Sequence, residues 1–269
     1  MPKNFFKGII LLSLYAAFMT SCSKKEENKV LIKTSEGDIL IELFDDTPKH
    51  KANFLKLAKE GYYNDLLFHR VIQEFMIQGG DPDSRKAEQS KILGEGDPGY
   101  TIDAEFRNNH IHQKGALAAA RTSDDENPEK KSSGSQFYIV QGKKFTDEDL
   151  NKVEIKVNTK LKANLYSSIL QKKLTLLGDN YDQKEFQNIM QRVKDSIDNV
   201  LMPKLNFSIP TKNRSVYKEV GGVPHLDGNY TVFGQVIEGF EVIDRIAAKE
   251  TDSNDRPKKD VKIINIKVL

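Results

Sequence analysis

The feature of the sequence that most suggests chemistry is an arginine among large apolar residues, in the segment FHRVIQEFMIQGGD (68–81). Alternate residues of a strand share a face, so a strand here places Arg70 between Phe68 and Ile72. Such an arginine is either an exposed ion-pair partner or a hydrogen-bond donor held in a nonpolar cleft. Two further segments also place polar or aromatic side chains in alternation, which adds candidates for such a cleft. They read GSQFYI at 134–139 and LDGNYTVFG at 226–234.

Signatures of covalent and metal-dependent catalysis are missing from the sequence. It contains no G-x-S-x-G, H-E-x-x-H or G-x-x-x-x-G-K-[ST] motif. The segment GEGDPG (94–99) is rich in glycine, but its two carboxylates have the wrong charge for binding phosphate, so we expect a surface loop. His110, His112 and the acidic run 124–126 are interpreted as solvent-exposed loop residues. The sequence therefore predicts no metal site and no cofactor.

Composition narrows the functional class further. The chain has 269 residues with 41 basic and 39 acidic side chains, a net charge of +2. A nucleic-acid-binding protein usually has a much stronger basic character, so we expect no nucleic-acid partner. The single cysteine precludes an intramolecular disulfide and a cysteine-based zinc cluster. An apolar fraction of 38% is ordinary for a folded globular protein.

The N-terminus has the pattern of an export signal. Lys3 and Lys7 precede an apolar run of eleven residues, 8–18 (GIILLSLYAAF). A helix needs about 20 residues to span a bilayer, so this run is too short and fits the apolar region of a secretory signal. Residues 1–21 are therefore predicted to be a signal peptide.

The residues around the expected cleavage site predict a lipid anchor. The stretch MTSC (19–22) resembles the lipobox of bacterial lipoproteins, which makes Cys22 the predicted site of lipidation and the membrane contact. Residues 22–29 then form a polar tether. Their Lys-Lys-Glu-Glu is similar to short signals that send some Bacteroidetes-type lipoproteins to the cell surface, but a solvated linker is the favoured interpretation. The alternative for the whole region is a plain signal peptide with an incidental cysteine.

Hydrophobic periodicity predicts a β-rich body with two helices. One helix opens at Thr47-Pro48 and ends at Gly61, and the other covers about 240–248. The predicted strands are 30–34, 39–44, 67–72, 75–78, 115–120, 136–141, 231–237 and 261–269.

A segment of different character, 143–219, interrupts this body. Apolar residues recur at three- and four-residue steps from Leu150 to Ile169 and from Phe186 to Val200, which predicts a hairpin of two amphipathic helices. The segment carries 15 Lys or Arg against 10 Asp or Glu. We expect the hairpin to extend a binding surface, offering a basic face to unfolded chains or to anionic membrane. The alternative is an insertion with an ordinary solvated surface.

The three segments FHRVI-x-x-FMIQGGD, GSQF and LDG-x-x-x-VFG, in this order, resemble the cyclophilin family of peptidyl-prolyl isomerases. The resemblance implies a mainly β fold, a closed antiparallel eight-stranded barrel with capping helices. Residues 30–142 would form its first part and 220–269 its second, with 143–219 inserted between them.

The resemblance also assigns the site. It implies that Arg70 is the catalytic residue. It implies a proline pocket of Phe75, Met76, Tyr138 and Leu226, polar substrate contacts from Gln78 and Gln136, and a backbone-binding stretch at Ala120 and Arg121. His225 and Tyr230 complete the predicted substrate site. They depart from the family pattern, because cyclosporin-sensitive members commonly have Trp at the first position and many members have His at the second.

These expectations lead to a functional hypothesis. The protein is expected to be an isomerase in the cell envelope, anchored by lipid, that assists the folding of proline-containing exported or unfolded polypeptides. The alternative is a membrane-anchored chaperone or peptide-binding module in which turnover is secondary. Arg70 favours the first, because binding alone would not need it. A hydrolase based on His69 or His225 lacks a nucleophile with a suitable partner.

Overall fold

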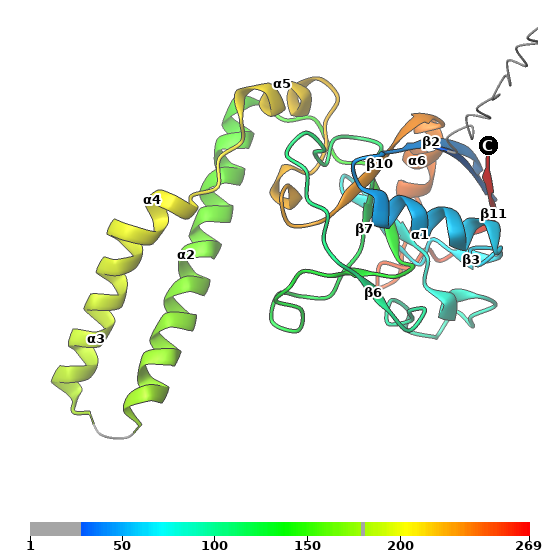
Figure 1. Cartoon of the computed structure of the whole chain (residues 1–269). Helices are drawn as coiled ribbons and strands as arrows, with labels where there is room; N and C mark the ends of the chain where they lie inside the picture. The colour runs from blue at the N-terminus through cyan, green and yellow to red at the C-terminus, as the bar shows by residue number, and fades with distance from the viewer. Residues whose placement is uncertain (1–27, 179–180) are drawn as a thin grey trace, which may run out of the picture.

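The computed structural model describes residues 28–178 and 181–269, and its centre is an antiparallel sheet of nine strands (Figure 1). Neighbouring strands follow the order β3-β11-β1-β2-β10-β7-β9-β5-β4, and β6 pairs separately with β8. The strands are β1 Lys29–Thr34, β2 Gly37–Leu43, β3 Leu66–Leu67, β4 Arg70–Ile72, β5 Met76–Gly79, β6 Thr101–Ile102, β7 Ala116–Ala119, β8 Ser132–Ser133, β9 Phe137–Val140, β10 Val232–Glu238 and β11 Lys262–Val268.

The curled antiparallel sheet confirms the predicted mainly β, barrel-like fold, but its edge strands β3 and β4 do not pair with each other. The edge strands β3 and β4 are consecutive in the chain and are separated by Phe68 and His69. The single strand predicted at 67–72 is divided because its first half pairs with β11 and its second half with β5. If β3 and β4 are counted as one strand, the sheet has the eight strands that the resemblance implied.

The hairpin of β1 and β2 shows why this sequence forms a barrel wall. Residues of alternate positions are buried, and both strands turn their buried face to the same core. The turn between them needs glycine at Gly37, where φ is +133° and an added Cβ would lie 2.8 Å from a methyl of Val242. Lys29, assigned to the tether in the sequence, is the first residue of β1. The signal peptide and Cys22 lie outside the described residues.

Two helices pack against the barrel, as expected. Helix α1 is Pro48–Lys59, with proline in its first turn, and α6 is Phe240–Ala247. Both contribute apolar side chains to one large core with the sheet. Its central aromatic ring is Phe54, which is 2% exposed and lies within 5.5 Å, between ring centroids, of Tyr63, Phe137 and Phe233.

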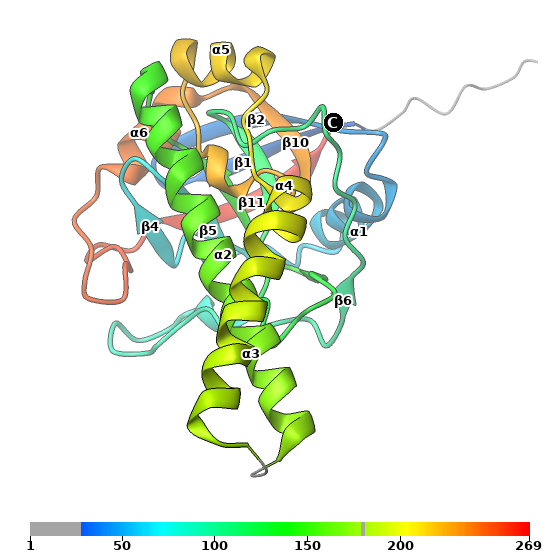
Figure 2. The same cartoon turned by 90° about the vertical axis from the view of Figure 1, so that its left-hand side faces the viewer.

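The segment 143–219 forms helices that project from the barrel (Figures 1 and 2). A capping box between Thr146 and Asp149 starts the long helix α2. The predicted two-helix pattern is present, but α5 was not predicted, because a nine-residue helix shows little periodicity. The helices are α2 Asp147–Leu177, α3 Gln183–Ser196, α4 Met202–Leu205 and α5 Thr211–Glu219, with a π-helical turn Ile197–Leu201 between α3 and α4.

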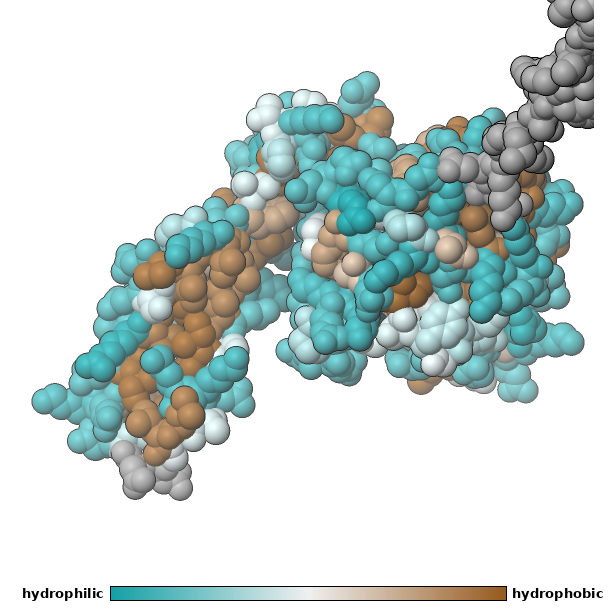
Figure 3. Space-filling view, viewed as in Figure 1, coloured by the Kyte–Doolittle hydropathy of each residue, from teal (hydrophilic) through white to brown (hydrophobic). Residues whose placement is uncertain are grey.

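The core of this hairpin is thin. Ile189, Val193 and Ile197 are buried against the flank of α2, and Figure 3 shows apolar residues gathered between the two helices. Other apolar residues of α2 face solvent, among them Leu176, which is 86% exposed. No helix among the described residues is both long and apolar enough to cross a membrane. Short 3₁₀ turns elsewhere are η1 Pro82–Ser84 and η3 Pro224–Leu226.

Candidate active site

A cavity of about 300 Å³ is walled by β4, β5 and β9 and by the segments that follow β7 and precede β10. It brings together residues from all three sequence segments. Gln136 and His225 lie instead in two adjoining cavities, of about 640 and 520 Å³. The predicted site residues that line the 300 Å³ cavity are Arg70, Phe75, Met76, Gln78, Ala120, Arg121, Tyr138, Leu226 and Tyr230.

Strand register places the polar and aromatic groups of this cavity in a row. Arg70 lies opposite Gln78 across β4 and β5, and Gln78 lies opposite Tyr138 across β5 and β9. Residues directly opposite each other project to the same face of a sheet. The barrel therefore aligns three side chains that are distant in the sequence, without any contribution from a flexible loop.

Arg70 is held at the edge of the cavity by one ion pair. Its Nε lies 3.3 Å from Oδ2 of Asp255, and both side chains are 42% exposed. Asp255 is itself fixed, because its carbonyl accepts a hydrogen bond of 2.8 Å from the backbone of Val71. The terminal guanidinium nitrogens make no hydrogen bond to any described residue. They remain available to a bound molecule.

The opposite side of the cavity is apolar and rigid. Met76 and Tyr138 are buried, and Phe75, Leu226 and Tyr230 pack against them in one cluster. Tyr230 meets Tyr138 edge to face, with ring centroids 5.9 Å apart. Phe75 stacks on His225 with centroids 6.0 Å apart. A small ring of carbon atoms would be enclosed here by packing alone.

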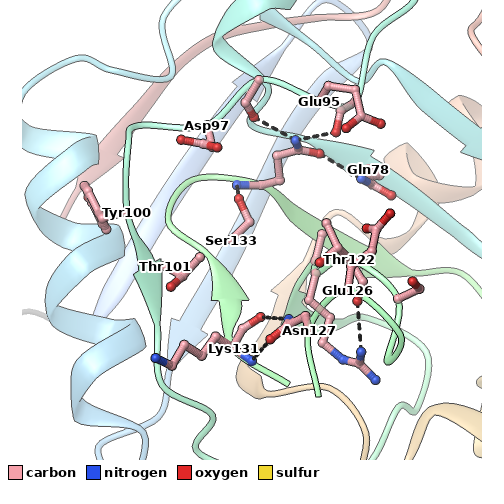
Figure 4. A pocket seen from close by; sticks show the side chains of 16 residues that line it. Gln78, Glu95, Asp97, Tyr100, Thr101, Thr122, Glu126, Asn127, Lys131 and Ser133 are labelled. Atoms are coloured by element: carbon pink, nitrogen blue, oxygen red, sulfur yellow. Dashed lines mark hydrogen bonds between the residues drawn. The ribbon is translucent and has the colours of Figure 1, made fainter. Parts of the chain in front are cut away.

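Gln136 was predicted to contact substrate, but its side-chain amide is occupied in the structure. Its Nε2 donates to the carbonyls of Gly94 and Gly96, at 2.7 and 2.8 Å, while its Oε1 accepts from Gln78 at 3.0 Å. Figure 4 shows Gln78 in the lining of the 640 Å³ cavity, close to Glu95 of the glycine-rich loop. The glycine-rich loop predicted at the surface is thereby fastened beside the site, and Gln78 is oriented by Gln136.

Arg121 has a free backbone beside the 300 Å³ cavity, whereas its side chain is already engaged within the fold. Its guanidinium lies 4.5 Å above the ring of Tyr230, donates to the Asn229 carbonyl and pairs with Asp124 at 2.7 Å. The side chain is only 5% exposed. The backbone N–H and carbonyl of Arg121, in contrast, bond to no described residue. Those of Ala120 are both used within the fold.

A buried hydrogen-bond chain behind Tyr138 was missed in the sequence. His112, interpreted above as solvent-exposed, is fully buried. Its Nε2 lies 2.9 Å from the Tyr138 hydroxyl, and its Nδ1 lies 2.9 Å from Oδ1 of Asp227. The other oxygen of Asp227 accepts a bond of 2.6 Å from the hydroxyl of Tyr217 on α5. A histidine with its proton on Nδ1 satisfies both neighbours, so Tyr138 donates to Nε2.

The inserted segment thus reaches the wall of the cavity through Tyr217, Asp227 and His112. The sequence held one signal for this, since Asp227 belongs to the LDG motif. Nothing in the spacing of His112 marked it as buried, because a histidine in an irregular stretch has no periodic context.

Two titratable side chains of the cavity wall, His69 and Tyr138, are uncharged at pH 7. Burial, the largest cause, lowers the pKa of His69 to about 4; Asp81 opposes the shift and Arg70 adds to it. His69 therefore contributes no positive charge at pH 7. Burial raises the pKa of Tyr138 well above its usual value, which keeps the phenol protonated as a donor. No group of three or more potential metal ligands occurs among the described residues.

Comparison with known proteins decides the family. The model of the family described as "Cyclophilin type peptidyl-prolyl cis-trans isomerase/CLD" matches residues 29–166 and 180–268 of the chain. The chain belongs to this family. It is a cyclophilin-type peptidyl-prolyl cis-trans isomerase, in agreement with the resemblance found in the sequence.

Two bacterial relatives extend this finding. A Staphylococcus aureus protein named as a peptidyl-prolyl cis-trans isomerase is 31% identical over 243 residues, covering 90% of this chain and 92% of its own length. A Streptococcus pyogenes protein named as a bifunctional phosphatase/peptidyl-prolyl cis-trans isomerase is 36% identical over 244 residues. The match spans 90% of this chain but only 38% of the streptococcal protein.

Solved structures support the fold. A cyclophilin-type isomerase of Cryptosporidium parvum has a TM-score of 0.52 and 21% identity, covering 90% of this chain and 97% of its own. The same protein crystallised in the presence of the dipeptide Ala-Pro gives a TM-score of 0.51 at 22% identity, with 90% and 98% coverage.

Proposed function

We propose that the 300 Å³ cavity isomerises X–Pro bonds in exported polypeptides by non-covalent catalysis, with Arg70 as the catalytic residue. The observation that carries this proposal is the position of Arg70. One ion pair through Nε fixes its guanidinium at the edge of an apolar cavity, and its terminal N–H groups have no described partner. A proline ring bound against Phe75, Met76 and Leu226 would bring its nitrogen toward these groups.

The chemistry of the reaction explains why an arginine is needed. Rotation about a peptide bond breaks amide resonance and has a barrier of about 18–20 kcal/mol. In the twisted state the prolyl nitrogen regains its lone pair and accepts a hydrogen bond. Arg70 donates to it most strongly at that moment, so the bond stabilises the transition state more than the bound substrate.

The energy required shows that Arg70 cannot act alone. Lowering an isomerisation time of about 10–100 s to milliseconds requires about 5–7 kcal/mol. A hydrogen bond to a charged group supplies about 1.5–3 kcal/mol. The rest comes from fixing the ring in the apolar wall and from excluding water. The free backbone N–H and carbonyl of Arg121 hold an extended substrate beside the bond that rotates.

Substitution of Arg70 tests this function. We expect Arg70→Lys to lower kcat/KM for an Ala-Pro peptide by about 10- to 100-fold, because an ammonium lacks the planar fork of donors. Arg192→Lys on the exposed surface of α3 is the matched control and should leave the rate unchanged. An Arg70→Lys variant as active as this control would contradict the proposal.

We further propose that the protein acts at the cell envelope as a lipid-anchored enzyme. The support is the apolar run 8–18 followed by the lipobox-like stretch that ends at Cys22. Intact-mass analysis of the membrane fraction should find an acylated Cys22 at the mature N-terminus, and Cys22→Ser should release the protein from that fraction. Recovery of the unaltered protein as a soluble form with a free thiol would refute the anchor.

A chaperone function of the helical segment is a second candidate. It is favoured by large apolar side chains left in solvent on α2, where Ile155 is 66% and Leu176 is 86% exposed. Exposed apolar residues of this kind bind the apolar side chains of unfolded chains without regard to proline.

A further inference from the structure

A second apolar cavity, of about 520 Å³, lies between α2 and the barrel. We call it the α2 groove. Its apolar lining comes from both sides, with Phe145, Val153 and Val157 on the inserted segment and Phe75 and Val223 on the barrel. A groove of this volume has room for one or two large apolar side chains.

Helix geometry gives one wall of the groove an alternating apolar and basic character. Val153, Lys156, Val157 and Lys160 follow one another at steps of three and one residues, which places them on one face of α2. Lys156 and Lys160 are exposed and form no ion pair with any described residue. Lys143, the third lysine of the rim, is already paired with Glu74 at 3.4 Å.

The α2 groove adjoins the proposed proline cavity. Phe75 lines both, and the ring of His225, which lines the groove, stacks on Phe75 with centroids 6.0 Å apart. The positive charges of Lys156 and Lys160 also act on His225, whose pKa is lowered first by loss of solvent and then by His112 and these lysines. The groove and the 640 Å³ cavity share no lining residue, so they adjoin the proline cavity at different places.

We propose that the α2 groove binds the segment of the substrate polypeptide that flanks the proline, and that it selects an apolar side chain accompanied by acidic residues. This inference rests on the proposed function of the adjoining cavity. An extended chain advances about 3.3–3.6 Å per residue, so residues only a few positions from the proline reach beyond Phe75. There an apolar side chain enters the groove, and carboxylates next to it meet Lys156 and Lys160.

Position and charge favour this occupant over a lipid. An anionic membrane would need a broad basic surface, whereas the two unpaired lysines stand beside an apolar groove that shares Phe75 with the catalytic cavity. The inserted helix thereby gives the enzyme a sequence preference that a barrel without it would lack.

Two peptides and two charge-reversal variants test the inference. The core peptide contains Ala-Pro with small neutral neighbours, and the flanked peptide carries Leu and Glu residues on both sides of the same Ala-Pro. We expect a higher kcat/KM for the flanked peptide with the unaltered protein. In Lys156→Glu/Lys160→Glu this advantage should fall by about three- to tenfold, as expected for two exposed ion pairs. It should also weaken with salt.

The control variant is Lys172→Glu/Lys173→Glu, which makes the same charge change on α2 outside the groove. It should keep the advantage, and both variants should turn over the core peptide at the original rate. Equal turnover of the two peptides by the unaltered protein, or an equal loss on both peptides in the groove variant, would overturn the inference. A groove variant that loses binding to phosphatidylglycerol vesicles but keeps its peptide preference would also overturn the inference, because the groove would then be assigned to lipid.

The proposed function fails separately from this inference. If Arg70→Lys turns over the core peptide normally, catalysis by Arg70 is wrong. If Arg70→Lys is inactive on the core peptide and the unaltered protein shows no preference for the flanked one, only the groove is wrong.

Discussion

The barrel and the helical hairpin of this protein differ in how their cores are packed. Side chains of the strands and of two helices form one large core in the barrel, and strand register fixes the positions of Arg70, Gln78 and Tyr138. The hairpin has a thin core of Ile189, Val193 and Ile197, and its outer surface keeps apolar side chains in solvent. A rigid body that aligns donors suits catalysis, whereas an adaptable, partly apolar extension suits the capture of variable chains.

The largest effect should come from opening the barrel core. Phe54→Ala removes a ring packed on three other aromatic side chains, and we expect it to lower the free energy of unfolding by about 3–5 kcal/mol. Val193→Ala in the hairpin removes fewer atoms from a smaller core and should leave the barrel transition in place. Urea unfolding followed by aromatic circular dichroism measures both. Equal losses in the barrel transition would show that the two regions fold as one unit.

The next effect concerns a hydrogen bond that links the inserted segment to the barrel. Tyr217→Phe removes the hydroxyl that donates to Asp227, so the carboxylate loses a charged hydrogen bond of about 1.5–3 kcal/mol. We expect lower stability, and lower kcat on a core peptide with little change in KM, because Tyr138 loses its orientation through His112. Tyr181→Phe, whose ring stacks on Phe186 at the tip of the hairpin, is the control and should change neither. A normal kcat in Tyr217→Phe would separate the insertion from the active site.

Acid should weaken the barrel through His69. Because the folded state holds the pKa of His69 at about 4, below its usual value near 6.5, the unfolded chain binds the proton more readily and stability falls as the pH drops through this window. The loss attributable to His69 is about 2 kcal/mol at pH 5. Denaturant unfolding at pH 7 and pH 5 should show it, and His69→Gln should remove that part of the difference. Identical pH dependence in both proteins would contradict the assignment.

Turnover, unlike stability, should vary little with pH. Arg70 stays charged throughout the physiological range, so kcat/KM for a short peptide should be nearly constant between about pH 6 and 9. A steep bell-shaped profile would instead indicate acid–base catalysis.

The smallest effect on chemistry should follow removal of the hairpin tip. Replacing residues 163–201 with a short Gly-Ser link keeps the α2 groove and Tyr217, so turnover of a core peptide should stay within about twofold of the original. Refolding of a whole protein client should slow, because the exposed Leu176 and the rest of the apolar surface of this tip are removed. Equal activity on both substrates would leave the hairpin without a role in capture. Removal of all of 144–218 is a poorer test, because it also takes away Tyr217.

Much of this structure could be predicted from the sequence, and the exceptions have physical causes. Alternation correctly placed Arg70 and Ile72 in one strand, but Phe68 lies before that strand in the main core. The row of Arg70, Gln78 and Tyr138 could not be derived from alternation, because it depends on which strands pair and in which register. The break at Phe68 and His69 was not predictable, since it depends on which partner each half of the strand finds. Gln136 was recognised as part of the site, but only the folded glycine loop shows that its amide is already occupied. His112 was mistaken for an exposed residue, because a histidine in an irregular stretch has no periodic context that marks it as buried.

The central claim is that Arg70 acts on the transition state rather than on binding. The most direct test measures the affinity of an Ala-Pro peptide and its cis–trans exchange rate on the same Arg70→Gln protein, by titration and exchange NMR. The account predicts an affinity within a few-fold of the original, held by the apolar wall and the Arg121 backbone, with exchange at least about tenfold slower. Loss of affinity with an unchanged exchange rate of the bound peptide would contradict it.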